Sequence, residues 1–269
     1  MSVRPRVMGI VNVTPDSFSD GGLHATAEGG LAQAMRLIGD GADILDIGGE
    51  STRPGADPVS ADIEIARVVP VIAAVHARWH GPISIDTMKP EVARAALAAG
   101  ATIWNDVTAL TFSPDSAAVA ADLGCEVVLM HMLGEPRTMQ VEPLYDDVVA
   151  EVADFLVARA EAAVAAGVAR ERITLDPGIG FGKTVEHNLA LIAHLDRLAA
   201  RGFPVLLGAS RKRMIRNIDP SAAEATDRLG GSIALALEGA RRGAVIVRVH
   251  DVRETVQALK TQAAIQAAS

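Results

Sequence analysis

The chain has little of what marks an exported or membrane protein. Its one cysteine, Cys125, cannot form an intrachain disulfide, which suits a reducing compartment and predicts an inert thiol in the core. The first residues, MSVRPRVMG, lack the apolar segment of a signal peptide, and no run approaches the roughly 18 apolar residues of a membrane span. We therefore expect a cytoplasmic protein with no membrane partner.

Clusters of basic residues and interdomain linkers are also missing. The net charge of -8 and the pI near 5.4 argue against a nucleic-acid partner, because binding to a phosphate backbone needs clustered lysine and arginine. No low-complexity tract, linker-like stretch or block of like charges interrupts the 269 residues. We expect a single domain over residues 1–269, in which any anionic ligand is held by local groups.

What the chain does contain is a repeat of eight short apolar segments, spaced roughly thirty residues apart and each ending in polar residues. Such segments are typical of buried parallel strands covered by helices. Helical patterns lie between them: Pro90 opens a helix that Gly100 ends, and Asp146 caps a helix from Val148 to Ala166. The expected strands are Val7–Thr14, Ile44–Thr52, Ile83–Thr87, Thr102–Val107, Glu126–Met132, Ile173–Gly180, Val205–Lys212 and Val245–Val252.

This alternation predicts an α/β fold, the (β/α)₈ TIM barrel, which takes about 250 residues and has its active site at the C-terminal strand ends. The alternative is an open doubly wound sheet, but a dinucleotide-binding sheet would need G-x-G-x-x-G after the first strand, where this chain has NVTPD. In a barrel, the polar side chains that end the strands converge on one mouth. They are Asn12, Thr52, Asp86, Asn105, His131, Asp176, Lys212, Arg248 and His250.

Two long loops follow the first two expected strands. Residues 14–22 (TPDSFSDGG) and 48–56 (GGESTRPGA) combine glycine with charged and hydroxyl groups. This composition is typical of lids that close over a substrate, with a solvated turn cluster as the alternative.

Asp86, Asn105, Asp176 and Lys212 form a second set, each at or near a strand end in an apolar context. A buried carboxylate must pair with a positive group or receive donors from a ligand, so an internal pair with Lys212, or a hydrogen bond from the backbone, is the structural alternative. Together the four match a flat heterocycle with several N–H donors and a carbonyl, whose oxygen Lys212 would bind.

The last expected strand holds Arg248 and His250 on one face, which is the interior face if Val247 and Val249 face the helices. Arginine suits phosphate oxygens, histidine adds a donor, and Asn12 on the neighbouring strand could give an oxygen to Mg²⁺. A helix start near Met214 could bind a carboxylate, with Arg213 beside it. The sequence has no zinc-like ligand spacing and no Gly-x-Ser-x-Gly elbow.

The motifs as a group strongly resemble dihydropteroate synthase, a family of pterin-binding enzymes. The resemblance spans the expected barrel from end to end. The matching segments are Gly9–Gly22, Asp46–Ala56, Ser84–Thr87, Asn105–Val107, Leu129–Met139, Leu175–Thr184, Ser210–Lys212 and Arg248–Val252.

The resemblance implies that 7,8-dihydropterin-6-ylmethyl diphosphate condenses with 4-aminobenzoate to give 7,8-dihydropteroate and diphosphate, with Mg²⁺, in a homodimer. Diphosphate would leave first, and the arylamine would then attack a pterin-methyl cation. The residues implied as catalytic are Asn12, Asp86, Lys212, Arg248 and His250.

The same resemblance assigns binding roles. The pterin would be held by Asp86, Asn105, Asp176, Phe181, Gly208, Lys212 and Arg248, and the metal by Asn12. The diphosphate would be held by Thr52, Arg53, Arg248 and His250. The aminobenzoate pocket, where sulfonamides compete in this family, would be built by Asp16, Phe18, Asp20, Pro54, Ser210 and Arg213.

The chain departs from the family pattern at two places. Thr108 and Ala109 stand where many relatives have Ser-Gly, and Arg213 stands where serine is common. The aminobenzoate carboxylate would therefore be bound by the Arg213 side chain, by backbone N–H groups, or by both. Two alternatives remain: a methyltetrahydrofolate–corrinoid methyltransferase, which has no use for a diphosphate clamp, and a non-catalytic pterin-binding paralogue, which would be expected to lose loop or diphosphate residues.

Overall fold

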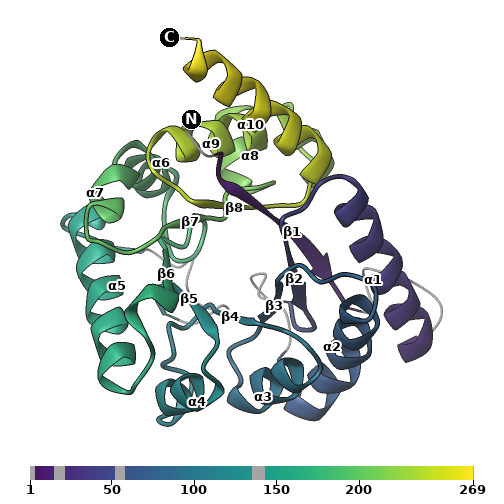
Figure 1. Cartoon of the computed structure of the whole chain (residues 1–269). Helices are drawn as coiled ribbons and strands as arrows, with labels where there is room; N and C mark the ends of the chain where they lie inside the picture. Colours follow the sequence, from purple (N-terminus) through teal and green to yellow (C-terminus); the bar gives the residue numbers. More distant parts are fainter. Residues whose placement is uncertain (1–3, 15–21, 52–57, 135–142, 269) are drawn as a thin grey trace.

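A ring of parallel strands surrounded by helices forms the molecule (Figure 1). The computed structural model describes residues 4–14, 22–51, 58–134 and 143–268. All eight expected strands are present. They are β1 (Arg6–Asn12), β2 (Ile44–Gly48), β3 (Ile83–Asp86), β4 (Ile103–Asp106), β5 (Glu126–Met130), β6 (Ile173–Asp176), β7 (Leu206–Leu207) and β8 (Ile246–Val249).

The sheet is a nearly closed barrel, so the doubly wound alternative is wrong. Its strand order is β6-β5-β4-β3-β2-β1-β8-β7, and every pair of neighbours is parallel. A single parallel bridge between Leu175 and Val205 joins β6 to the segment that leads into β7 and completes the ring. The strands end earlier than the sequence indicates, because strand pairing stops where the polar loop residues begin.

Helices cover the outside of the barrel (Figure 1). The α-helices are α1 (Gly22–Gly39), α2 (Ala61–His76), α3 (Pro90–Ala98), α4 (Ser116–Leu123), α5 (Val148–Ala165), α6 (Val185–Ala193), α7 (Leu195–Ala199), α8 (Arg213–Ile218), α9 (Leu229–Arg241) and α10 (Val252–Ala267). Two 3₁₀ turns, η2 (Arg170–Arg172) and η3 (Ala225–Arg228), precede β6 and α9. Within the described ranges, no helix is long and apolar enough to cross a membrane.

The start of α5 corrects one prediction. Asp147, not Asp146, caps this helix: its carboxylate accepts the N–H groups of Val149 and Ala150 at 3.0 and 3.1 Å. Asp146 instead donates its backbone N–H to Glu151. Because Asp146 and Asp147 are adjacent, the sequence pattern does not distinguish which of them is the N-cap.

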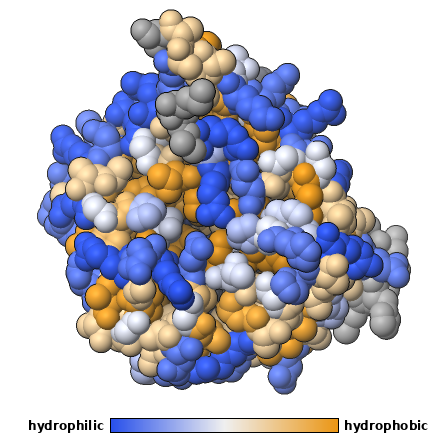
Figure 2. Space-filling model, in the orientation of Figure 1, coloured by the Kyte–Doolittle hydropathy of each residue, from blue (hydrophilic) through white to orange (hydrophobic). Residues whose placement is uncertain are grey.

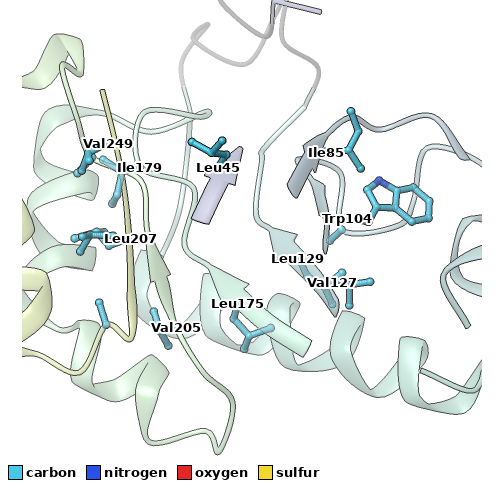
Figure 3. Packing of buried hydrophobic residues seen from close by; sticks show 14 of the residues in the cluster. Leu45, Ile85, Trp104, Val127, Leu129, Leu175, Ile179, Val205, Leu207 and Val249 are labelled. Carbon is cyan, nitrogen blue, oxygen red and sulfur yellow. The ribbon is translucent and has the colours of Figure 1, made fainter. Parts of the chain in front are cut away.

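The main hydrophobic core lies between the strands and the helices. Side chains of alternate strand residues, such as Ile85, Trp104 and Leu129, join helix residues in one large cluster (Figure 3). Cys125 belongs to this cluster, and burial raises its thiol pKa to about 11, as expected of an inert core residue.

The interior of the barrel contains two layers of side chains. The lower layer is a separate apolar cluster of Met8, Ile44, Ile103, Val128, Leu206 and Ile246. Two residues further along the same six strands lies the upper layer: Ile10, Asp46, Asn105, Met130, Gly208 and Arg248. Because side chains alternate across a strand, both layers point inward, and the upper one faces the mouth.

Candidate active site

A pocket at the C-terminal ends of the strands gathers the polar side chains of the upper layer. It encloses about 350 Å³, part of which is open solvent. All seven residues that the family resemblance assigns to pterin binding line this pocket. Its lining is Asp86, Asn105, Val107, Met130, Asp176, Gly178, Ile179, Phe181, Gly208, Lys212 and Arg248.

Strand alternation explains why these residues meet. On β3, Ile83 and Ile85 pack outward in the main core, so Asp86 points inward. On β8, Val247 and Val249 pack outward in the same way, and this leaves Arg248 in the pocket. Gly208 has no side chain, so the pocket stays open where a Cβ would lie 3.5 Å from a carboxylate oxygen of Asp176.

A network of ion pairs forms one side of the pocket. The Arg248 guanidinium donates through Nε to Asp46 at 2.5 Å and through Nη2 to Asp86 at 2.6 Å. Asn105 donates its amide to the same Asp46 oxygen at 3.1 Å. One cation thus faces two carboxylates, and burial raises the pKa of Asp86 to about 7 against the attraction of Arg248. A ligand with N–H donors would relieve this excess of acceptors.

Asp176 and Lys212 lie on the other side. Asp176 is buried and accepts the Gly178 N–H at 2.7 Å, and burial raises the pKa of its carboxyl. Lys212 has no carboxylate within 4 Å among the described residues, so the alternative of an internal pair with Lys212 is wrong, whereas the alternative of a backbone donor is found at Asp176. Its Nζ lies 4.3 Å from the centre of the Phe181 ring, and burial lowers its pKa to about 8. The amine is available to a ligand carbonyl.

His250 and Ser210 meet beside the pocket, just past β8 and β7. The Ser210 hydroxyl lies 3.1 Å from His250 Nδ1 and accepts a hydrogen bond from the backbone N–H of His250 at 3.2 Å. Burial and the charge of Arg248 lower the imidazole pKa to about 3, so His250 is neutral near pH 7. Arg213 is the first residue of α8 and its side chain is exposed, as a contact to a free carboxylate requires.

Asn12 ends β1 in line with the inward-facing Met8 and Ile10, so its amide faces the barrel mouth. Among the described residues, no group of three or more His, Cys, Asp or Glu side chains could hold a metal ion. Mg²⁺ that is bound mainly by phosphate oxygens and water needs only one or two protein oxygens. The Asn12 amide oxygen fits that limited role.

Six predicted residues lie outside the described part of the chain. They belong to the two loops interpreted as lids and are Asp16, Phe18, Asp20, Thr52, Arg53 and Pro54.

The structure corrects the place of His131. Its ring is buried and does not line the pocket; it packs edge-on against Phe155 with ring centres 5.0 Å apart. The preceding residue, Met130, points into the pocket, and alternation turns His131 away.

Sequence reasoning missed two further features. Asp46 supports both Asn105 and Arg248, and the signal was its place between the outward-facing Leu45 and Ile47. Arg211 is not a solvated turn residue: it pairs with Asp251 at 2.5 and 2.9 Å and has a left-handed backbone, φ 57°. This pair ties the segment that leads to Lys212 to the segment that follows His250.

The fold and the pocket define a (β/α)₈-barrel protein with a polar slot at its mouth. Residues 8–250 match the family of pterin binding enzymes. The dihydropteroate synthase of Neisseria meningitidis serogroup C is 52% identical over 265 residues, which cover 97% of this chain and 93% of that protein. The chain therefore belongs to the dihydropteroate synthase family, whose members are transferases.

Solved structures agree with this assignment. The Xanthomonas albilineans dihydropteroate synthase with 4-aminobenzoic acid is 54% identical with a TM-score of 0.93, over 98% of this chain and 94% of that one. The same enzyme in complex with 7,8-dihydropteroate is 50% identical with a TM-score of 0.90, over 99% and 95%. The Yersinia pestis enzyme in a sulfonamide drug complex is 45% identical with a TM-score of 0.92, over 99% and 95%.

Proposed function

We propose that this chain condenses 7,8-dihydropterin-6-ylmethyl diphosphate with 4-aminobenzoate to form 7,8-dihydropteroate and diphosphate. One observation supports this most strongly. One pocket combines two carboxylates and an amide on its walls with a lysine that has no carboxylate partner among the described residues and lies above an aromatic ring. A pterin has amino and ring N–H donors and one carbonyl oxygen, and this pocket complements all of them.

Binding of the pterin follows from the contacts. Asp176 and Asp86 accept N–H donors of the ring system, and Asn105 is oriented by Asp46. Lys212 donates to the carbonyl oxygen, and Phe181 forms an apolar wall next to it. The bound N–H donors favour the ionised form of the two buried carboxyls, whose pKa values are raised in the empty pocket.

Departure of diphosphate breaks the bond between the pterin methylene carbon and the diphosphate oxygen. The bonding electrons leave with the diphosphate, and the cation that remains is delocalised over a ring held by the Asp86 and Asp176 carboxylates. Nη1 of Arg248, which has no partner within the described ranges, and His250 lie where they can bind the leaving anion. When bound with the diphosphate, Mg²⁺ would neutralise further charge, and Asn12 would hold it.

The arylamine of 4-aminobenzoate then forms the new C–N bond and loses a proton to the released diphosphate or to water. Because its nitrogen is a neutral nucleophile, the site needs no strong base. Its carboxylate would meet the exposed Arg213, the backbone N–H groups near the start of α8, or both. Ser210, held by His250, lies at the border between this subsite and the diphosphate subsite.

A homodimer and a cytoplasmic location remain part of this proposal. The face shown in Figure 2 has hydrophobic patches interspersed with hydrophilic residues, and it does not single out one apolar surface for a partner. Light scattering at micromolar concentration tests the dimer: a mass near twice 28.0 kDa is expected, and a monomer would contradict it.

An activity assay with both substrates tests the reaction itself. Purified chain with Mg²⁺, the pterin diphosphate and 4-aminobenzoate should release diphosphate and form 7,8-dihydropteroate in equal amounts. Omitting the aminobenzoate should stop product formation. Binding of the pterin without turnover would indicate a non-catalytic paralogue. Methyl transfer from methyltetrahydrofolate to a corrinoid protein would indicate the methyltransferase alternative.

A further inference from the structure

Lysine is rare in this chain, and its few copies are not spread over the surface. There are four: Lys89, Lys183, Lys212 and Lys260. Only Lys260 is exposed, and the other three follow β3, β6 and β7 at the mouth of the barrel. Lys89 pairs with Glu50 and Glu64 at 2.6 and 2.7 Å, and Lys212 lines the pocket. These contacts account for two of the three lysines at the mouth.

Lys183 has neither kind of contact. It is 3% exposed, and no carboxylate of the described chain lies within 4 Å of its Nζ. Its Nζ donates to the Phe181 carbonyl at 2.9 Å and to the His131 carbonyl at 3.3 Å, and it lies 2.9 Å from His131 Nδ1. Burial lowers the pKa of Lys183 to about 7, so neutral acceptors surround an amine that is only partly charged at neutral pH. Burying such a polar group is costly unless its hydrogen bonds serve the structure around it.

The Phe181 carbonyl belongs to the segment of residues 177–184, which we call the slot loop. Gly178, Ile179 and Phe181 in this loop line the pocket. Gly178 has a left-handed backbone, φ 67°, and a Cβ there would overlap the His131 carbonyl oxygen. The slot loop therefore packs closely against the end of β5, and Lys183 joins it to His131 by hydrogen bonds.

Neutral groups hold the rest of the slot loop. Asn188 accepts the Gly180 N–H at 2.7 Å, and Tyr145 donates its hydroxyl to the Gly182 carbonyl at 2.9 Å. Neither of these bonds reaches Phe181. Among the described side chains, Lys183 alone bonds to the backbone of the residue whose ring forms the apolar wall beside Lys212.

We propose that Lys183 is a positioning residue for the pterin slot: it bonds the Phe181 carbonyl to His131 and so sets the distance between the Phe181 ring and the heterocycle. This role rests on the proposed function of the pocket. The imidazole suits it, because burial and the nearby Lys183 charge lower the His131 pKa to about 3 and leave Nδ1 free to accept. Lys183 also lies within electrostatic reach of Asp176, so its charge adds to the balance around that carboxylate.

The test compares Lys183→Met, Lys183→Gln and a matched control, Tyr145→Phe, which removes a different hydrogen bond to the same loop. The probe is 6-hydroxymethylpterin, followed by calorimetry, with steady-state kinetics alongside. Lys183→Met should weaken binding of the probe about tenfold, the loss expected when the acceptor of one buried hydrogen bond is left without its donor. It should raise KM for the pterin diphosphate by a similar factor and leave KM for 4-aminobenzoate unchanged.

The Gln variant keeps an N–H donor without the charge, so it should recover most of the probe affinity, and the Tyr145→Phe control should stay within about threefold of wild type. Lys183→Met with wild-type affinity and KM would overturn the inference. Should that variant fail to fold, His131→Leu takes its place, because it removes one partner of the ammonium while keeping the contact with Phe155. Its probe affinity should fall about threefold, and an unchanged affinity would also overturn the inference. If the wild-type chain does not bind the probe, the proposed function fails instead.

Discussion

The two layers inside the barrel are built on the same six strands but have opposite chemistry. The six residues of the lower layer are apolar, and Ser84 of β3 and Thr174 of β6 lie next to Ile103 and Val128 at the same level. The upper layer, two residues further on, contains Asp46, Asn105 and Arg248, and Asp86 and Asp176 from the two remaining strands stand beside it. The lower layer contains no charged side chain and packs as an apolar cluster, whereas the upper one balances buried charges against each other. The apolar lower layer therefore stabilises the barrel, whereas the buried charges of the upper layer lower its stability and leave polar groups for a ligand.

Backbone strain follows the same division. Within the described chain, three residues other than glycine have a positive φ: Ala109, Leu110 and Arg211. All three lie in segments that follow strand ends at the mouth. Asp106 accepts the Leu110 N–H at 2.9 Å, and Arg159 donates to the Ala109 and Leu110 carbonyls, so several hydrogen bonds hold the strained turn next to Val107 of the pocket.

Removal of the Arg248 guanidinium should have the largest effect on the free energy of unfolding. Arg248→Ala leaves Asp46 and Asp86 without a positive partner, and one oxygen of Asp46 already has no partner among the described residues. Breaking a buried pair in this way costs about 3–5 kcal/mol of unfolding free energy. Chemical denaturation measures it. Adding Asp46→Asn to the variant should restore part of the loss, and a variant as stable as wild type would show that the charges of the upper layer are not balanced by Arg248.

A cavity in the lower layer should affect stability without affecting binding. Ile103→Ala removes a side chain that is 1% exposed, and such truncations cost about 2–5 kcal/mol. The affinity for 6-hydroxymethylpterin should stay within about twofold of wild type, since no pocket residue is changed. Denaturation and calorimetry on the same preparation decide the point. A large loss of affinity would mean that the two layers are not independent.

Asp176→Asn should weaken ligand binding without lowering stability. The amide still accepts the Gly178 N–H but must turn a donor toward the ligand, so pterin binding should weaken by about 1.5–3 kcal/mol. Stability should hold or rise, because burial raises the pKa of the carboxyl and its ionisation opposes folding at neutral pH. Unchanged pterin affinity would remove Asp176 from the binding site.

Asp86 should contribute a distinct part of the pH dependence of stability. The Asp86 pKa is about 7 in the folded protein, above the usual value near 4 of the unfolded chain. The folded state therefore holds this proton more tightly, and the Asp86 contribution to stability should fall as pH rises from about 4 to about 7. The buried His131 and His250, whose pKa values are lowered to about 3, act in the opposite direction over much of this range, so the Asp86 contribution is measured as the difference between the curves of wild type and Asp86→Asn. That difference should change between about pH 4 and about pH 7, whereas Ile103→Ala should lower the curve without changing its shape. Parallel curves for wild type and Asp86→Asn would contradict the assignment.

The smallest effect should come from the strained turn. Ala109 has φ 53°, a left-handed backbone that glycine adopts without steric cost, so Ala109→Gly should stabilise the protein by at most about 1 kcal/mol. A thermal melt measures this. Val107→Ala is no suitable control because it changes the pocket, but Ala117→Gly, in the ordinary helix α4, should destabilise by a similar amount. Destabilisation by both would mean that the turn is not strained.

The fold and the gathering of polar side chains at one mouth could be predicted from the sequence because both follow from periodicity, whereas the assignment of a pterin to them came from the family resemblance. Strand ends at a fixed repeat place Asp86, Asn105 and Asp176 at one mouth, and alternation on β8 places Arg248. The strand-end rule failed for His131, because the inward position on β5 belongs to Met130. It also missed Asp46, which lies before the end of its strand.

Other features could not be read from sequence at all. The contacts of Lys183 and the pairing of Arg211 with Asp251 depend on how glycine-rich loops pack against each other, and local patterns do not determine this packing.

A crystal structure of the chain soaked with 7,8-dihydropteroate would show directly whether the polar pocket at the barrel mouth is the binding site. The account predicts the pterin ring in the slot, with its N–H groups on Asp86, Asn105 and Asp176, its carbonyl oxygen on Lys212, and the lower layer unchanged. A ligand bound elsewhere, or a pterin ring that does not contact Asp176, would contradict it.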